Sequence, residues 1–464
     1  MSAGPAHSPT IERAPRAAFP GPKSALMLEE MQKYVIADLF PFVVDLERSK
    51  GMYLATVDGQ MLFDWAGYFG AKLIGHNHPG LYEEDYVRRL IIAANNKIAN
   101  PDFLSLECLA YYRKLHEIAP VCMRSDKLEV YVINSGAEAI ENLMKYLLIK
   151  HEEKHGSCGG LMGKRRFIYF DRAFHGRTVY ALNVTQPLHD PLITNGFNGV
   201  APGNIRVPFP SADNSQPEEW NSRRSAESLA LIEEHLKEHG NEIVGIIVEP
   251  IQGAGGQRIA RKEFFQRLSD LTHRYGVYLA FDEIQTAGGQ LGTIFACDQL
   301  DLPHPPQAVA VGKKFANGAV YMLDPMMTEG VLDSTWGGTL ADMVRFVQEM
   351  AIVEREHLIV QVPEKERVLK GGLEALTDKY PDLMFNVRGM GLYQGFTLRS
   401  KALRVEVQRA AREDESLLLL GGGMQTIRFR PALDVSIDEI KLMLTKLDRV
   451  LAKLKPNSGQ VENS

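Results

Sequence analysis

Short apolar runs alternate with longer amphipathic segments through the middle of the sequence, and this alternation restricts the possible folds more than any other feature. The apolar runs occupy residues 127–133, 167–170, 244–250, 277–283 and 307–312. Segments with helical spacing of apolar residues occupy 137–154, 225–240 and 262–276. Buried strands separated by helices are typical of a mostly parallel sheet with helices on both faces. We therefore predict an α/β fold built on such a sheet.

The two ends of the chain have a different pattern. Residues 53–65 are typical of a β-hairpin, because the Asp58-Gly59 pair is a turn signal between two short apolar segments. Beyond residue 340 a long helical stretch precedes RGMGLYQGFTL, a further helix, a glycine-rich turn and TIRFRPAL. This pattern predicts a second, smaller α+β domain.

Composition argues against several classes of protein. The net charge of -6 over 464 residues gives no reason to expect nucleic acid or an anionic membrane as a partner. The sequence has no apolar run of about 18 residues, as a membrane-spanning helix requires, and its first residues lack the apolar core of a secretory signal. The four cysteines are scattered without metal-ligand spacing: Cys108, Cys122, Cys158 and Cys297. We expect a cytoplasmic protein with reduced thiols and no bound metal.

Residues suited to chemistry follow five of the predicted strands. In an open α/β sheet, ligands bind beyond the carboxyl ends of the strands. The side chains found there are Ser135, Gly136 and Ala137, then Phe174, His175 and Arg177, then Glu249, then Asp282, Glu283 and Gln285, and finally Lys313 and Lys314. Each group also has a plain structural interpretation, such as an ordinary strand-to-helix turn, a surface pair or solvated carboxylates.

The convergence of these groups favours a cofactor site over the plain interpretations. Small residues at a helix N-terminus suit a phosphate, a lysine forms a Schiff base with an aldehyde, and a carboxylate pairs with a pyridinium nitrogen. These are the groups that a phosphorylated, ring-shaped aldehyde cofactor needs. A dinucleotide is the alternative, but no G-x-G-x-x-G follows a predicted strand.

The motifs SGAEA, FHGRT, VEPIQGAGG, FDEIQT, GKK, STWGG and RFRPAL, in this order and spacing, resemble the class III (fold type I) pyridoxal-phosphate aminotransferases. The similarity spans roughly residues 27–455, and within the class it is greatest to the L-lysine 6-aminotransferases, followed by the 4-aminobutyrate aminotransferases. It implies a large domain with a mostly parallel sheet and a smaller α+β domain made from both chain ends. The expected parts are an arm (1–26), the first part of the small domain (27–79), the large cofactor domain (80–339) and the rest of the small domain (340–464).

The resemblance also implies a role for each residue at the strand ends. Lys313 would bind pyridoxal 5'-phosphate covalently and later transfer the proton, while Asp282 would pair with the pyridine nitrogen. Further cofactor contacts are expected from Ser135, Gly136, Ala137, Phe174, His175, Glu249 and Gln285, and from Thr335 across a homodimer interface. Arg177 and Arg430 would hold substrate carboxylates. Lys314 is left to a structural contact or to solvent, because successive strand residues point to opposite faces.

The activity implied is transfer of the terminal amine of L-lysine to 2-oxoglutarate, giving 2-aminoadipate 6-semialdehyde and glutamate. One departure bears on the substrate: Ala254 stands where the lysine and 4-aminobutyrate enzymes have a glutamate that neutralises the second arginine, and Gln257 does not restore the charge. Arg430 would then stay an uncovered cation and favour donors with a carboxylate near the amine. A 4-aminobutyrate or other amino-acid aminotransferase is therefore the alternative. The segment 315–324 is expected to form an unusual loop beside the site.

Overall fold

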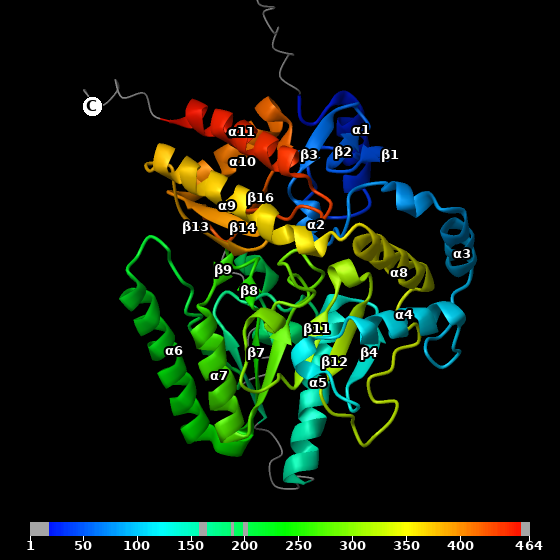
Figure 1. The fold of residues 1–464 in the computed structure, drawn as a ribbon, viewed down its shortest axis with the longest axis vertical. Coiled ribbons are helices and arrows are strands. Elements are labelled where there is room, and N and C mark those ends of the chain that lie inside the picture. Colours follow the sequence, from blue (N-terminus) through cyan, green and yellow to red (C-terminus); the bar gives the residue numbers. More distant parts are fainter. Residues whose placement is uncertain (1–17, 157–164, 187–189, 198–202, 456–464) are drawn as a thin grey trace, which may run out of the picture.

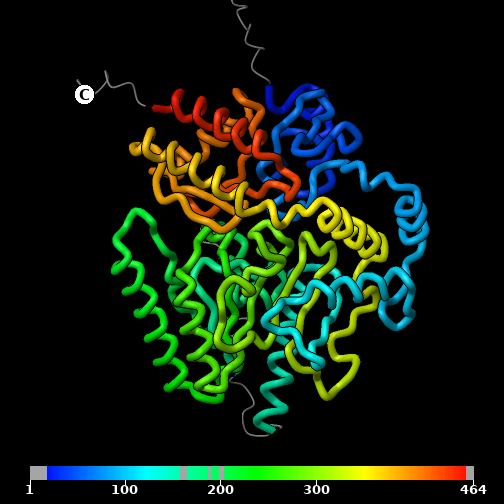
Figure 2. The backbone as a smooth tube through the Cα atoms, viewed as in Figure 1, coloured from blue at the N-terminus to red at the C-terminus, as the bar shows by residue number. Residues whose placement is uncertain are grey.

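The computed structural model describes residues 18–156, 165–186, 190–197 and 203–455. Figure 1 shows a lower body, coloured cyan to green, that contains a large sheet and its helices, and an upper body made from the blue and the orange-to-red ends of the chain. Figure 2 shows the chain leaving the upper body along one side, building the lower body, and returning through a yellow segment. The two ends of the chain thus contribute to one body, as the resemblance implies.

The large sheet has seven strands and is mostly parallel. Their order across the sheet is β4 (Glu129–Ile133), β12 (Gly318–Met322), β11 (Ala308–Val311), β10 (Tyr278–Asp282), β7 (Ile243–Val248), β5 (Arg166–Phe170) and β6 (Ile205–Val207). The pairs β10–β11, β10–β7, β5–β7 and β5–β6 are parallel, whereas β12 runs antiparallel to β4 and β11. The predicted α/β fold class is confirmed.

The predicted loop at 315–324 is wrong, because β12 occupies half of it. Gly318 to Met322 are all buried and pair with β11 on one side and β4 on the other. The strand packs so closely that a Cβ on Gly318 would lie 2.1 Å from the Ser135 carbonyl oxygen. The Asn317-Gly318 pair resembles a turn signal, but here the glycine is needed for this close approach.

Alternate residues of β11 pack into two different cores, as the two-residue period of a strand requires. Ala308 and Ala310 join the cluster that also contains Ile140, Leu143 and Leu147 of α5 (Gly136–His155). Val309 and Val311 join the larger cluster on the other face. That cluster also contains buried side chains of α7 (Lys262–Tyr275) and α8 (Leu340–Arg355). The sheet is therefore buried on both faces.

Two smaller four-stranded sheets form the upper body. One has the order β13 (Met384–Met390), β14 (Tyr393–Leu398), β17 (Thr426–Arg428) and β16 (Leu420–Gly422). The other has the order β1 (Val44–Lys50), β2 (Tyr53–Thr56), β3 (Met61–Asp64) and β15 (Leu417–Leu418). The strands β2 and β3 confirm the predicted hairpin. Because β15 pairs with β3, both chain ends share one sheet, while the division at 79/80 and 339/340 stays a prediction.

The remaining elements connect or cover these sheets. They are α1 (Pro22–Gln32), α2 (Gly67–Gly70), α3 (Glu84–Asn95), α4 (Leu106–Glu117), α6 (Glu218–His239), β8 (Ile251–Gln252), β9 (Arg258–Ile259), α9 (Val362–Lys379), α10 (Lys401–Glu415) and α11 (Ile437–Leu454). The first 17 residues of the expected arm lie outside the described residues, and α1 begins within its last part. In the described part of the chain, every helix is too short or too polar to span a bilayer.

Candidate active site

Lys313 stands directly beyond β11, at the start of the 3₁₀ turn η7 (Lys313–Phe315). Its φ is 50°, in the left-handed region that costs a non-glycine residue about 1–3 kcal/mol. The preceding Gly312 is packed so tightly that a Cβ there would lie 3.2 Å from the Gly136 Cα. This turn holds the Lys313 amine beyond the sheet, where Nζ donates to the Phe69 carbonyl at 3.0 Å.

Lys313 is buried between two cations and two carboxylates, and burial has the largest effect on its charge. Burial and the guanidinium groups of Arg428 and Arg430 lower the pKa of Lys313 to about 7, against the opposite effect of Asp282 and Glu249. A large fraction of Lys313 is therefore a neutral amine near neutral pH. A neutral amine is the form that can attack a carbonyl or accept a proton.

This lowered pKa predicts unusual reactivity in the apoenzyme. Reductive methylation read by peptide mass spectrometry should modify Lys313 with a midpoint near pH 7. The same peptide in denatured protein should need a pH near about 10.4, the value for a free lysine. A midpoint for Lys313 near the denatured value would contradict the proposed electrostatics of the site.

Three buried ionisable groups lie at the ends of neighbouring strands. The Asp282 carboxylate bonds to His175 Nδ1 through Oδ2 at 2.7 Å and accepts the Ile284 N–H through Oδ1 at 3.0 Å. Burial alone would lower the pKa of His175, but the bond to Asp282 and its charge raise it above the ordinary value. Burial raises the pKa of Glu249 to about 7, and its carboxylate accepts the Phe174 N–H at 3.0 Å. Asp282 is thus fixed in orientation by two bonds.

The N-terminus of α5 offers backbone hydrogen-bond donors. Ser135 caps the helix by accepting the Glu138 N–H, and the Glu138 carboxylate accepts the N–H groups of Asn134 and Ser135. The first two helical residues, Gly136 and Ala137, have no intrahelical acceptor for their N–H groups. These two groups, at the positive end of the helix dipole, are suited to a phosphate. The Ser135 hydroxyl oxygen accepts the capping bond, and its O–H can still donate to a ligand.

Arg430 is buried among neutral hydrogen-bond acceptors. Its guanidinium donates to the Gln285 side chain at 2.9 and 3.2 Å, to the Gln257 side chain at 2.6 Å and to the Phe429 carbonyl at 2.7 Å. It also lies 4.2 Å from the centroid of the Tyr393 ring. Gln257, which restores no charge, nevertheless supplies an acceptor. Burial lowers the pKa of Arg430 to about 10, so the group remains a cation near neutral pH.

Arg428 is a second cation that the sequence analysis missed. It ends β17, two residues before Arg430, which lies beyond the strand. Its Nε donates to the Gly421 carbonyl at 2.9 Å, while its buried Nη1 has no partner among the described residues. Burial and the charge of Arg430 lower its pKa to about 9. The repeated arginine in RFRPAL is the signal that could have identified it.

The first glycine of the IQGAGG segment packs directly on this network. A Cβ on Gly253 would lie 1.8 Å from Gln285 Oε1 and 3.0 Å from Arg430 Nη2. We expect Gly253→Ala to displace Gln285 and to lower kcat/KM for an anionic keto acid about tenfold, because bonds to a charged group contribute about 1.5–3 kcal/mol. Gly371→Ala in α9 is the control, since a Cβ there meets nothing within 4 Å. Equal steady-state kinetics for both variants would contradict the prediction.

Three predicted residues lie at the margin of the cluster. Phe174 is partly buried, and the Arg177 guanidinium lies 5.9 Å from its ring centroid. Arg177 is exposed. Thr335 is also exposed, in a loop whose Ser334 hydroxyl accepts from the Asn134 side chain at 3.2 Å. These positions allow Arg177 and Thr335 to reach a bound ligand or a second chain, and their roles stay predictions.

Lys314 has a structural role in the described chain. It is 2% exposed, and its Nζ donates to the carbonyl oxygens of Gln285 at 2.5 Å and Gly70 at 3.4 Å and to the Tyr393 hydroxyl at 2.7 Å. The Gly70 carbonyl belongs to α2, whose Phe69 carbonyl accepts hydrogen bonds from the Lys313 amine and the Gln285 side-chain amide. The sequence analysis missed α2 because nothing in its local pattern indicates contact with residues more than 200 positions away.

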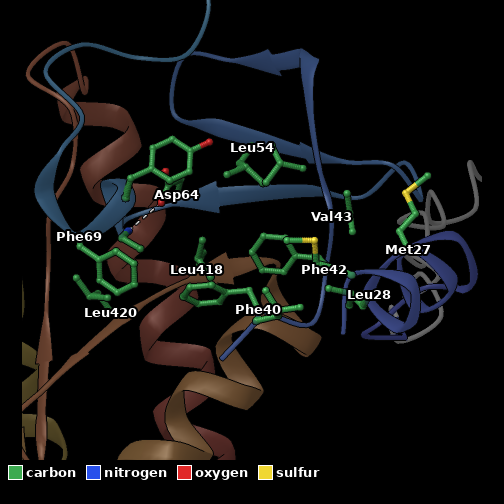
Figure 3. A pocket seen from close by; sticks show the side chains of 15 residues that line it. Met27, Leu28, Phe40, Phe42, Val43, Leu54, Asp64, Phe69, Leu418 and Leu420 are labelled. Atoms are coloured by element: carbon green, nitrogen blue, oxygen red, sulfur yellow. Dashed lines mark hydrogen bonds between the residues drawn. The ribbon is translucent and has the colours of Figure 1, made fainter. Parts of the chain in front are cut away.

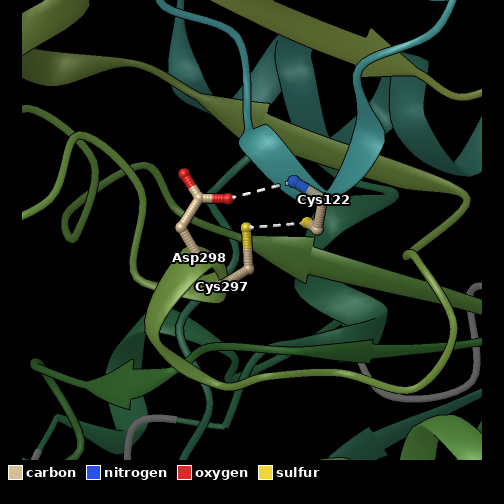
Figure 4. Close-up of side chains that lie close together, drawn as sticks. All are labelled: Cys122, Cys297 and Asp298. Carbon is tan, nitrogen blue, oxygen red and sulfur yellow. Dashed lines mark hydrogen bonds between the residues drawn. The ribbon is translucent and has the colours of Figure 1, made fainter.

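Glu283, the neighbour of Asp282, anchors a distant segment instead of facing solvent. Its carboxylate accepts the N–H groups of Ala296 and Cys297, each at 2.8 Å. Figure 4 shows Cys297 beside Cys122, with their sulfur atoms 3.9 Å apart and Asp298 next to them. The fold thus brings together two cysteines that are far apart in the sequence, while Cys158 lies outside the described residues.

Phe69 also lines a separate apolar cavity of about 420 Å³. Figure 3 shows its lining of Met27, Leu28, Phe40, Phe42, Leu54 and Leu418, with Asp64 at one side. The Asp64 carboxylate already accepts the N–H groups of Ala66 and Gly67. This lining does not suit a phosphate or a carboxylate, so the cluster around Lys313 is the better candidate for the active site.

Three features lie together beyond the ends of the strands: a lysine with a lowered pKa, a buried carboxylate of fixed orientation and the N-terminus of a helix. This combination is typical of pyridoxal-phosphate enzymes. Residues 36–451 match the family model "Aminotransferase class-III", and the chain belongs to this family. It is 30% identical to an L-lysine-epsilon aminotransferase of Amycolatopsis lactamdurans, over 94% of this chain and 98% of the relative. It is 27% identical to the mitochondrial 4-aminobutyrate aminotransferase of Rattus norvegicus, over 94% and 90%.

Solved structures show the same relationship. A lysine aminotransferase from M. tuberculosis in the internal aldimine form superposes with a TM-score of 0.85 at 29% identity, covering 93% of this chain and 99% of that one. The chain is therefore an aminotransferase of fold type I, and its cofactor is pyridoxal phosphate. When bound, the cofactor supplies an electron sink for negative charge at the carbon that carries the amine. The free N–H groups of α5, the buried Asp282 and the amine of Lys313 fit this group.

Proposed function

We propose that the enzyme transfers the terminal amine of L-lysine to 2-oxoglutarate, forming 2-aminoadipate 6-semialdehyde and glutamate. The observation that carries this proposal is the near full-length similarity to relatives named L-lysine-epsilon aminotransferases. The arginines provide further support. Arg177 is exposed, where it suits the distant carboxylate of lysine, and Arg430 is a buried cation that suits a carboxylate of the keto acid.

We assign the proton transfer to Lys313. With a pKa of about 7, its Nζ can take the proton from the substrate carbon that carries the amine and deliver it, within the same half-reaction, to a different carbon from the one that lost it. Asp282, oriented by His175 and by the Ile284 N–H, would face the cofactor's ring nitrogen. Gly136 and Ala137 would bind the phosphate, Phe174 would pack against the ring, and Gln285 would orient the ring's oxygen while holding Arg430.

A panel of amines tests the proposed donor. The holoenzyme is incubated with 2-oxoglutarate and with L-lysine, L-ornithine, 4-aminobutyrate or L-alanine, and glutamate is measured. L-Lysine should give the highest kcat/KM, with an aldehyde product that o-aminobenzaldehyde traps. A higher value for 4-aminobutyrate or for L-alanine would reject lysine as the preferred donor while leaving the aminotransferase class intact.

One observation favours a second candidate, an aminotransferase for donors with a carboxylate near the reacting amine. The hydrogen bonds of Arg430 go to neutral groups, and position 254 follows the glycine that packs against its Nη2. An uncovered cation there would attract the α-carboxylate of an ordinary amino acid.

Restoring the carboxylate separates the two candidates. Ala254→Glu should raise the ratio of kcat/KM for L-lysine to that for L-alanine about tenfold, because a screened charge pair contributes about 1.4 kcal/mol at this partly buried site. Ala254→Gln is the control, because glutamine has nearly the same size as glutamate but carries no charge. If both variants shift the ratio equally, size rather than charge controls the choice of donor.

We also propose that the active enzyme is a homodimer with shared sites. The N-terminal segment exposes large apolar side chains, with Leu26 70% and Ile36 fully exposed. Such side chains are typical of surfaces that a partner covers. Thr335 is exposed in the loop next to the α5 N-terminus, where it could reach a neighbouring chain's cofactor. Analytical ultracentrifugation of the holoenzyme tests this, and a monomer with full activity would reject it.

A further inference from the structure

A cavity of about 350 Å³, lined by basic side chains, borders the second half of the IQGAGG segment. Gly255 and Gly256 line this cavity, whereas Gly253 and Gln257 of the same segment contact the Arg430 network. Four arginines line it, at positions 172, 224, 258 and 388, together with a single carboxylate from Asp213. None of these side chains has a place in the proposed transamination.

Two of the four arginines use their donors in hydrogen bonds to other residues of the chain. Arg388 donates to the carbonyl oxygens of Gly256, Gln257 and Asn386 and to the hydroxyls of Thr397 and Thr426, at distances of 2.6–3.0 Å. These five bonds use all its N–H groups. Arg258 donates to Gln252, to the Phe209 carbonyl and to Asp171. Both contribute positive charge to the cavity while their donors are largely occupied.

The other two arginines have donors to spare. Arg224 lies with its guanidinium carbon 4.8 Å from the centroid of the Trp220 ring, which orients it. Its Nε is buried and has no hydrogen-bond partner in the described part of the chain. The Arg172 side chain is 46% exposed, and its Nε lies 3.9 Å from the Asp171 carboxylate, beyond hydrogen-bond distance. The guanidinium of Arg224 thus has an N–H that the described residues do not satisfy.

The negative groups nearby do not supply that partner. Asp213 uses its Oδ1 to accept the N–H and the hydroxyl of Ser215, at 2.9 and 2.6 Å. Asp171 pairs with Arg258 at 3.2 Å. The cavity therefore keeps an excess of positive charge, which is costly in a partly buried site unless an anion enters.

The floor of the cavity consists of closely packed glycine backbone. A Cβ on Gly255 would lie 2.6 Å from the Arg172 carbonyl oxygen, and a Cβ on Gly423 would lie 2.9 Å from the Gly255 carbonyl oxygen. Gly256 has a φ of 117°, which L side chains rarely adopt. Side chains are thus excluded from the floor, and space remains between the arginines.

We propose that this cavity binds a small multivalent oxyanion, with Arg224 and Arg172 as its charged donors. Planar guanidinium groups recognise phosphate and carboxylate through paired hydrogen bonds, so the ligand is a phosphate-bearing or a polycarboxylate metabolite. The site is linked to the catalytic cluster through Arg388, which holds the Gln257 carbonyl at 2.7 Å, and through the Gln257 side chain, which accepts from Arg430 at 2.6 Å.

The test uses the holoenzyme in a zwitterionic buffer at constant ionic strength, titrated with inorganic pyrophosphate in one arm and citrate in the other. Calorimetry measures affinity, and tryptophan fluorescence reports on the site because Trp220 lines it. We expect at least one probe to bind with a Kd below about 1 mM and to change the emission in a way that Trp220→Phe abolishes. The tighter probe identifies the class of oxyanion.

Two neighbouring residues on α6 provide the variant and its control. Arg224→Gln should weaken this binding at least about tenfold, as expected for loss of a charged hydrogen-bond donor. Arg223→Gln should leave it unchanged within about twofold, since Arg223 is 68% exposed and pairs with Glu227 at 3.7 Å. Binding that is absent for both probes, unaffected by Arg224→Gln, or equally weakened by Arg223→Gln would overturn the proposal. None of these outcomes depends on which amino donor the enzyme uses.

Discussion

Replacing Lys313 with alanine is expected to lower kcat for transamination by at least about 10³-fold, because the variant lacks both the amine that binds the cofactor and the group that moves the proton. Lys313 is suited to both tasks by its position beyond β11 and by its pKa of about 7. Lys313→Arg should fail similarly, since a guanidinium stays protonated near neutral pH. Stopped-flow and steady-state assays of glutamate formation measure the loss.

Stability separates this chemical role from a structural one. Folding lowers the pKa of Lys313 from an ordinary value of 10.5 to about 7. At a pH below 10.5 the unfolded chain therefore binds this proton more tightly than the folded chain, and protonation opposes folding. The stability of the apoenzyme should therefore rise with pH between about 7 and 10, and Lys313→Ala should remove this part of the pH dependence without lowering the unfolding temperature at pH 7. A variant that unfolds early would mean that Lys313 supports the fold.

Replacing Arg430 with glutamine is expected to raise KM for 2-oxoglutarate and to lower its kcat/KM at least about 30-fold. Removing one partner of a buried charge pair costs about 2 kcal/mol or more. The substituted amide could keep a bond to Gln257 or Gln285, but it has no charge to offer a carboxylate. Each half-reaction is measured separately in single-turnover experiments.

The lysine half-reaction is the internal control for this variant. If Arg177 holds the distant carboxylate of lysine, the donor half should change by less than about threefold, a difference below 1 kcal/mol. Equal losses in both halves would show that Arg430 supports the folded site in general, through its contacts with Gln285, Gln257 and Tyr393.

The strand ends were predictable because their signal is local. The runs that became β10 and β11 are apolar on both faces, and a charged residue directly beyond such a run, Asp282 or Lys313, must lie at the sheet edge. The same reasoning predicted the α5 N-terminus from SGAEA. Residues that act within a few positions of a strand end are therefore within reach of the sequence pattern.

Contacts between distant segments were not predictable in the same way. The Phe69 carbonyl meets Lys313 across 244 positions of sequence, and its direction depends on the turn in α2, where Tyr68 and Phe69 have φ of 49° and 61°. Gln257 contacts Arg430 across 173 positions. The antiparallel β12 was missed for a different reason, since its Asn317-Gly318 start has the composition of a turn although its glycine serves close packing.

The most direct test of the account follows the nitrogen atom. The holoenzyme is given 2-oxoglutarate and L-lysine labelled with ¹⁵N at either the ε or the α position, and the glutamate formed is examined by mass spectrometry. The account predicts labelled glutamate from the ε-labelled substrate and unlabelled glutamate from the α-labelled one. Label from the α position, or no glutamate from either substrate, would contradict it.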